Sequence, residues 1–213
     1  ALLDLPEHSV MVGGLDYWQG DMREIQEDRL AAELSSLLGR PIVLREPPHK
    51  DESAGVRQKR GIKVFRFPSW YVAQVEVQWS DATGRVYRSR PLVRERDLRT
   101  GKYLDRDKKK RNVVPVRFVR ACTRGHIEDI DWYAFVLNDP QARMQGDLWL
   151  DEGGAANDFK EIYVRLMSGE RVVARRRLAD ATAPGSVALG WCKGRALWLG
   201  PEVREGCSEP MKL

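Results

Sequence analysis

The sequence has 213 residues, of which 42% are apolar and 31% charged, with a formal net charge of +5. This length suits one large domain or two small ones, and the apolar share is enough for a core, so wholesale disorder is excluded. No apolar run reaches the roughly 18 residues of a membrane-spanning helix. The opening ALLDLPEHSV also lacks the basic leader and apolar segment of a signal peptide. Three cysteines are too few for a disulfide framework, which favours a reducing, cytoplasmic location.

The clearest predicted element is a helix over residues 22–38. Asp21 and Glu24 have the spacing of a capping box, and leucines recur at helical intervals until Gly39 offers a left-handed stop. We expect the leucine stripe to belong to the core rather than to a binding surface. The predicted buried set is Leu30, Leu34, Leu37, Val116 and Phe118, with Trp132 packed near them.

Short strands dominate the rest of the pattern, and the segment 71–79 alternates valines with polar residues. Acidic residues after His126 favour a short helix at 127–136, where they would complement the helix dipole. The predicted fold class is α+β, with mostly short antiparallel strands, a long N-terminal helix and short helices near 127–136. The predicted strands are 62–67, 71–79, 85–93, 113–121, 146–150, 161–166 and 171–178.

A change in composition suggests how the chain is divided. Residues 94–112 are almost wholly charged, which predicts an exposed excursion between two parts. The first part, 1–93, holds the predicted helix and early strands. The second, 113–213, holds the blocks RFVRACTRGHIEDIDW and GWCKG.

Basic residues are concentrated in three clusters rather than spread evenly. Such runs are usually solvated loops, but three of them beside predicted strands favour a composite basic face that contacts nucleic acid. The predicted nucleic-acid-binding residues are Arg57, Lys59, Arg60, Lys108, Lys109, Lys110, Arg111, Arg175, Arg176 and Arg177.

A candidate metal site rests on four residues. Three residues separate Cys122 from His126, and Cys192 lies in the knuckle-like turn GWCKG, with Cys207 further on. Three thiols and an imidazole suffice chemically for zinc, although no C-x-x-C pair is present. Buried reduced cysteines and a hydrogen-bonded histidine fit the same pattern, and the sequence leaves both interpretations open.

Catalytic signatures are weak. Asp158, Phe159 and Lys160 have the D-x-K form of metal-dependent nucleases, and Asp147 is a further acidic candidate. The tripeptide is common by chance, and no P-loop, G-x-S-x-G or H-E-x-x-H motif occurs. Seven tryptophans and several arginines could stack nucleobases, but such aromatic side chains are more often core or interface anchors.

Several ordered blocks resemble one known family. They are ALLDLPEHSVMVGGLDYW, RFPSWY, VPVRFVRACTRGHIEDIDWYAFV, GDLWLDEGGAANDFKEIYVR and LGWCKGRALWLGPEVREGC. The chain thereby resembles the N-terminal part of the DrmB family, the helicase-associated accessory proteins of the DISARM phage-defence system. The family's cysteine pairs after the F-P-x-W strand and after 161–166 are replaced here by VAQVEV and LMSGE, and Ala196 stands where the family favours proline. Cys192 and Cys207 match family cysteine positions, which implies zinc.

The resemblance implies a non-catalytic, DNA-associated scaffold that partners a DrmA-like helicase in bacterial anti-phage defence. A metal-dependent nuclease and a protein-interaction module without nucleic-acid contact are the alternatives. We expect no enzyme activity from this chain, no membrane contact, and zinc as the one cofactor that its side chains could hold.

Overall fold

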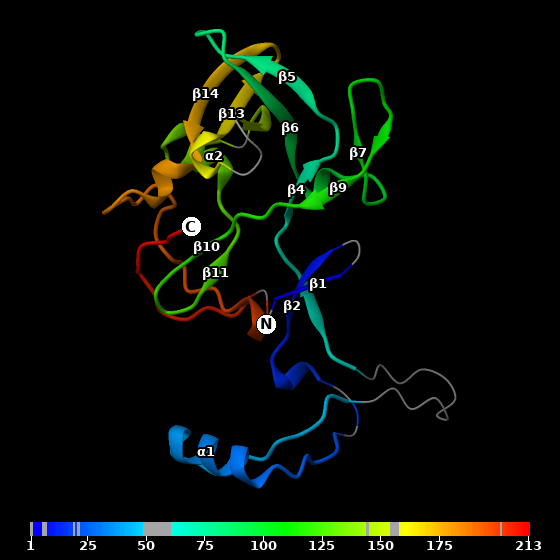
Figure 1. Cartoon of the computed structure of the whole chain (residues 1–213), viewed down its shortest axis with the longest axis vertical. Helices are drawn as coiled ribbons and strands as arrows, with labels where there is room; N and C mark the ends of the chain where they lie inside the picture. Colours follow the sequence, from blue (N-terminus) through cyan, green and yellow to red (C-terminus); the bar gives the residue numbers. More distant parts are fainter. Residues whose placement is uncertain are drawn as a thin grey trace.

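The computed structural model describes residues 2–5, 8–18, 20, 22–48, 61–143, 145–153, 158–200 and 202–213. Its main feature is an antiparallel sheet in which β5 and β4 pair with successive parts of one edge of β6, and β12 pairs with the other edge (Figure 1). In sheet order the strands are β14 (Arg171–Arg177), β13 (Ile162–Ser168), β12 (Asp147–Glu152), β6 (Val86–Arg94), β4 (Trp70–Ala73) and β9 (Val113–Pro115), with β5 (Val77–Ser80) on β6.

One face of this sheet forms the core. Because side chains alternate along a strand, the cross-strand register places Leu92, Leu148 and Leu166 in one row. All three are buried, and the helix α2 (Trp132–Leu137) contacts β13 and β14. Burying such a leucine contributes about 1.5–3 kcal/mol to stability. The predicted burial of Val116 and Trp132 is confirmed, and Phe118 packs against the core while half-exposed.

The opposite face is polar and aromatic. Trp149 pairs with Arg165 across β12 and β13, and Arg165 pairs with Arg175 on β14. The end of β5 turns back toward β14, so that the guanidinium of Arg175 lies 4.9 Å from the ring of Trp79. The sheet is therefore curled around this face.

Smaller elements surround the sheet. Three strands, β1 (Leu2–Asp4), β2 (Ser9–Val12) and β3 (Val64–Arg66), form a second sheet, and two hairpins are β7 (Tyr103–Leu104) with β8 (Lys110–Arg111) and β10 (Arg120–Ala121) with β11 (Ile127–Glu128). Short 3-10 turns are η1 (Leu15–Tyr17), η2 (Glu95–Asp97), η3 (Phe159–Glu161), η4 (Leu178–Thr182) and η5 (Leu197–Leu199). Among the described residues no helix has the length and apolar character needed to cross a bilayer.

The predicted long N-terminal helix is wrong. The helix α1 spans Asp28–Leu38, and none of its residues is buried. Residues 23–25 are extended because they pair with 44–46, with N–H groups of Ile25 and Glu46 donating to carbonyls across the pair. The left-handed stop at Gly39 is confirmed, with φ of 64°, whereas the predicted cap, Asp21, lies outside the described residues.

The burial of the α1 leucines is also wrong. Leu30 is 48% and Leu37 is 77% exposed, and Leu34 is partly exposed. Figure 1 shows the reason, because α1 lies away from the main sheet and has no core to face.

The helix predicted at 127–136 is shorter and begins later. Ile127 and Glu128 form β11, and α2 starts after Asp131, whose carboxylate accepts the N–H of Ala134 at 3.1 Å. The predicted α+β class with a long helix is thus corrected to a mostly antiparallel β fold with two short α-helices among the described residues. The main sheet takes β4, β5 and β6 from the predicted first half and the other strands from the second.

Candidate metal centre and basic hairpin

Side chains with metal-ligating atoms converge from three separate segments of the chain. One ligand atom from each of the four residues lies within 4.8 Å of the others. The Sγ of Cys122 is 3.4 Å from Nδ1 of His126 and 4.0 Å from Sγ of Cys207. Cys192 completes the cluster, in which only Cys207 is not fully buried. The structure therefore brings together all four residues predicted as metal ligands.

The hairpin of β10 and β11 positions the first two ligands. The N–H of Cys122 donates to the carbonyl of His126 at 3.0 Å, and the N–H of Gly125 donates to the carbonyl of Cys122 at 3.0 Å. Gly125 has φ of 85°, a left-handed conformation that glycine adopts at little cost. This tight turn places the thiol and the imidazole on the same side.

The other two ligands come from the irregular C-terminal segment. The N–H of Gly194 donates to Sγ of Cys192 at 3.2 Å. The carbonyl of Gly194 accepts the N–H of Glu205 at 2.7 Å. Gly194 has φ of +65°, and a Cβ there would overlap the carbonyl oxygen of Glu205. Glycine is therefore required where the segments carrying Cys192 and Cys207 approach each other.

The pKa values of two of the thiols are shifted in opposite directions. Burial raises the pKa of the Cys122 thiol, but hydrogen bonds from the side chain and backbone of His126 and from the backbone of Arg124 outweigh burial, and the pKa falls to about 7. Burial raises the pKa of Cys192 to about 12, even though the N–H of Gly194 opposes this. The contact with Cys122 raises the pKa of His126.

This donor set fits zinc. Tetrahedral zinc, with bonds of about 2.3 Å to sulfur and 2.0 Å to nitrogen, holds its ligand atoms about 3.5–3.8 Å apart, close to the observed 3.4 and 4.0 Å. The other ring nitrogen of His126 lies 3.1 Å from Oε2 of Glu205, the carboxylate contact that orients zinc-bound imidazoles. Four protein ligands leave no position for water, so such a site would be structural.

Of the predicted basic residues, the β14 arginines are used within the fold. Arg175 lies 3.2 Å from Asp151, Arg176 donates to the carbonyl of Phe135 at 2.9 Å, and Arg177 pairs with an acid at 3.2 Å. Arg175 and Arg176 are therefore engaged in packing the strand, whereas the side chain of Arg177 is 50% exposed. Residues Arg57, Lys59 and Arg60 lie outside the described part of the chain.

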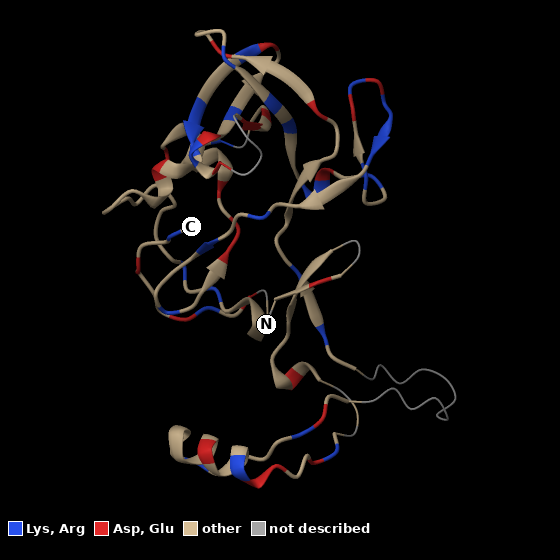
Figure 2. Ribbon diagram, viewed as in Figure 1, with Lys and Arg blue, Asp and Glu red and all other residues tan. Residues whose placement is uncertain are grey.

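The β7–β8 hairpin presents the remaining cluster. Asp105 organises its loop, because it accepts Nε of Arg111 at 2.6 Å and the N–H of Lys109 at 2.8 Å. The hydrogen bond from Arg111 lowers the pKa of Asp105. Within the described residues, the side chains of Lys108, Lys109 and Lys110 are exposed and make no ion pair. Figure 2 shows the hairpin extending from the sheet, with basic stretches of the ribbon in blue along β8 and the adjoining loop.

The nuclease candidates do not come together as a site. Asp158 caps η3 by accepting the N–H of Lys160 at 3.0 Å, while Asp147 is exposed at the start of β12. Among the described residues, the cluster of cysteines and His126 is the single group with three or more potential metal ligands.

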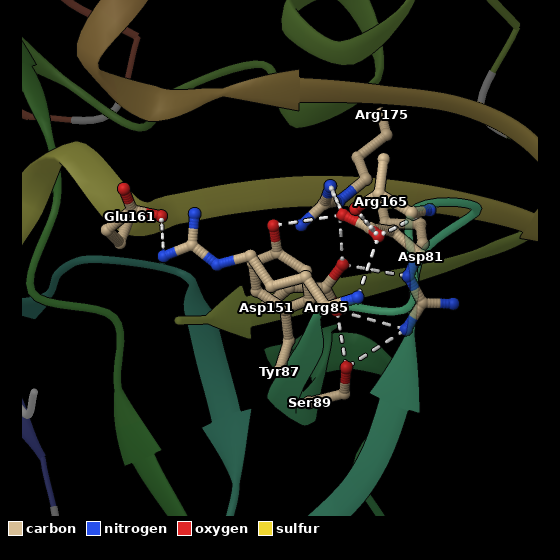
Figure 3. A network of polar contacts seen from close by, with 9 residues as sticks. Asp81, Arg85, Tyr87, Ser89, Asp151, Glu161, Arg165 and Arg175 are labelled. Carbon is tan, nitrogen blue, oxygen red and sulfur yellow. Dashed lines mark hydrogen bonds and ion pairs between the residues drawn. The ribbon is translucent and has the colours of Figure 1, made fainter. Parts of the chain in front are cut away.

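A buried polar network was not anticipated from the sequence. Asp151, with no exposed surface, accepts from Arg165 at 2.8 and 3.0 Å and from Ser89 at 2.5 Å. Figure 3 shows Arg175 reaching the same carboxylate from β14. The guanidinium of Arg175 also lies 3.8 Å from the ring of Tyr163. The alternation of side chains along these strands was the one sequence signal that they share a face. The pairing itself has no local signal, because the residues of the network come from distant segments of the chain.

The fold and the cluster define a mostly antiparallel β protein with a buried set of three cysteines and one histidine. A family model described as "Domain of unknown function (DUF8724)" matches residues 1–213, and the chain belongs to this family. No curated protein matches the chain. The description of the family names no activity, so the resemblance to the DrmB family remains a prediction.

Proposed function

We propose that this chain is a non-catalytic accessory module that contacts the phosphate backbone of DNA. The observation that carries the proposal is the trio Lys108, Lys109 and Lys110 on the β7–β8 hairpin, exposed and without an ion pair among the described residues. Exposed lysines of this kind contribute nothing to the hydrophobic core of the protein. An anionic partner such as a phosphate backbone would relieve the repulsion between their charges.

Zinc has a supporting part in this proposal. When bound, it would hold the β10–β11 hairpin against the C-terminal segment through Cys122, His126, Cys192 and Cys207. These segments have little regular structure of their own, so metal binding would contribute to folding rather than to a reaction.

The biological setting follows from the resemblance. A DrmB-like protein would act with a DrmA-like helicase in the bacterial cytoplasm during anti-phage defence. The exposed leucines of α1 support association with a protein partner, because contiguous exposed apolar side chains often mark such surfaces. If α1 alone were functional, the chain would be a protein-interaction module, which is the second candidate.

The test is a titration of the chain with labelled duplex DNA at several salt concentrations, using the triple variant Lys108→Ala, Lys109→Ala, Lys110→Ala. Each phosphate contact contributes about 0.7–0.9 to the slope of log affinity against log salt, so loss of three contacts should flatten the slope by about 2–3 units. Arg111 is left in place because it pairs with Asp105.

A matched control removes the same charge elsewhere. Arg23, Arg29 and Arg40 are exposed residues around α1, and changing all three to Ala should leave the slope of the DNA titration nearly unchanged. Equal slopes for the hairpin variant and the wild type would overturn the DNA proposal. Loss of helicase copurification with DNA binding intact would favour the interaction module.

A further inference from the structure

A cavity of ≈ 480 Å³ lies between the β7–β8 hairpin and the polar face of the main sheet. Trp79 and Trp149 line it from the sheet, and Tyr103 lines it from the hairpin. Its size falls within the range of small-molecule sites. The cavity therefore joins aromatic rings to the hairpin that carries the exposed lysines.

The aromatic rings of the cavity differ in how closely arginine side chains already cover them. The guanidinium of Arg165 lies 4.1 Å and that of Arg175 lies 4.9 Å from the Trp79 ring. Over Trp149, Arg165 is at 5.6 Å and is the one cation over this ring among the described residues. Trp149 is partly exposed, and Tyr103 is too. These two rings can still accept a flat partner.

The charge of the lining selects a neutral ring over a phosphate. Three arginines in the lining are matched by three acids, Asp105, Asp107 and Glu170. An anion would gain little inside, whereas carboxylate oxygens accept hydrogen bonds from the exocyclic amino groups of bases. The uncompensated positive charge lies outside the cavity, on the lysines of the hairpin loop.

We propose that this cavity receives one unpaired nucleobase of a single-stranded nucleic acid, stacked on Trp149 and Tyr103, while the hairpin lysines contact the flanking phosphates. Bases of every type have a face that can stack, so the site would be tolerant of sequence. The inference rests on the proposed DNA contact and deepens it by naming the strand form.

The experiment compares Trp149→Ala with the wild type for binding of a short labelled single-stranded DNA and of the matching blunt duplex. Loss of one stacked base costs roughly 1–3 kcal/mol, so single-strand affinity should fall roughly 5- to 150-fold while duplex affinity stays the same. Trp149→Phe, which keeps a ring, should recover most of the loss. Binding should also quench tryptophan fluorescence in the wild type and much less in Trp149→Ala.

Two further variants keep the result decisive. Tyr103→Ala removes a ring that belongs to the hairpin and not to a strand of the main sheet, so it tests the cavity even if Trp149→Ala fails to fold. Trp191→Ala removes a tryptophan that is 57% exposed and lies outside the cavity lining, and it should behave as wild type.

The outcomes separate the two proposals. Single-strand binding unchanged in the ring variants, but lost in the triple lysine variant, would overturn the base pocket and leave the DNA contact standing. If the ring variants lost single-strand and duplex binding equally, the base pocket would be overturned as well. A wild type that binds neither DNA would overturn both proposals.

Discussion

At the scale of single residues, the candidate metal centre depends on contacts that hold its ligands in place. Gly194 donates its N–H to the Cys192 thiol, and Glu205 contacts the ring of His126. The ring of Trp198 stacks on the same imidazole, with centroids 6.3 Å apart. These contacts fix the orientation of the ligand side chains in the folded chain.

We expect the purified chain to hold about one zinc ion, and His126→Ala to hold much less. Because burial raises the pKa of Cys192 to about 12, its thiol is protonated at neutral pH in the metal-free protein, and zinc binding should release protons. Elemental analysis gives the stoichiometry, and calorimetry in two buffers of different ionisation enthalpy gives the proton count. Chelation should lower the melting temperature.

The matched control is His8→Ala, which removes a partly exposed histidine outside the cluster and should retain the metal. Wild-type protein with well under one zinc per chain, prepared without chelator, would contradict the structural-zinc account.

The four ligands could be chosen from the sequence because thiols and imidazoles are rare and chemically distinctive. Their support was harder to find. The turn GWCKG signals Gly194, but nothing in the sequence places Glu205 beside His126, because the two are 79 positions apart and the chain between them must first fold. A long-range contact of this kind has no local pattern.

At the scale of elements, α1 and β14 show how little a local sequence pattern says about the partners of a side chain. The leucine spacing predicted a helix over 22–38, whereas α1 spans only Asp28–Leu38, and its exposed leucines show that an apolar stripe does not guarantee a core to face. In β14 the arginine run suggested a nucleic-acid surface, while in the fold Arg175 pairs with Asp151 on β12 and Arg176 donates to Phe135 on α2. Both cases concern partners, which a single sequence does not specify.

We expect Leu37→Ala to change the free energy of unfolding by no more than about 0.5 kcal/mol, because the side chain is 77% exposed. Leu166→Ala, on the buried face of β13, should cost about 2–5 kcal/mol. Urea denaturation of both variants makes the comparison. A large loss from Leu37→Ala in the isolated chain would mean that α1 packs against the protein after all.

The buried network makes a second prediction at this scale. Asp151→Asn should destabilise the chain by about 3–5 kcal/mol, since Arg165, only 2% exposed, would be left without its counter-charge. Asp147→Asn, at the exposed start of the same strand, serves as the control and should change stability by about 0.5 kcal/mol or less. Equal effects in urea denaturation would show that the network is solvated.

At the scale of the whole molecule, the net charge of +5 says less than its distribution. Several cations are neutralised inside the curled sheet, whereas Lys108, Lys109 and Lys110 on the β7–β8 hairpin are exposed and form no ion pair with any described residue. The hairpin lies over a cavity lined by aromatic rings, and the cysteine cluster joins a different hairpin to the C-terminal segment. The proposed binding surface and the candidate metal centre thus lie in separate parts of the chain.

The most direct test of the DNA contact is photo-crosslinking of the wild-type chain to single-stranded DNA, followed by mass-spectrometric mapping of the linked peptides. The account predicts crosslinks within residues 103–111 and at Trp149, where the basic hairpin and the cavity meet. Crosslinks confined to α1 or β14, or none at all under conditions where a known single-strand-binding protein is linked, would contradict it.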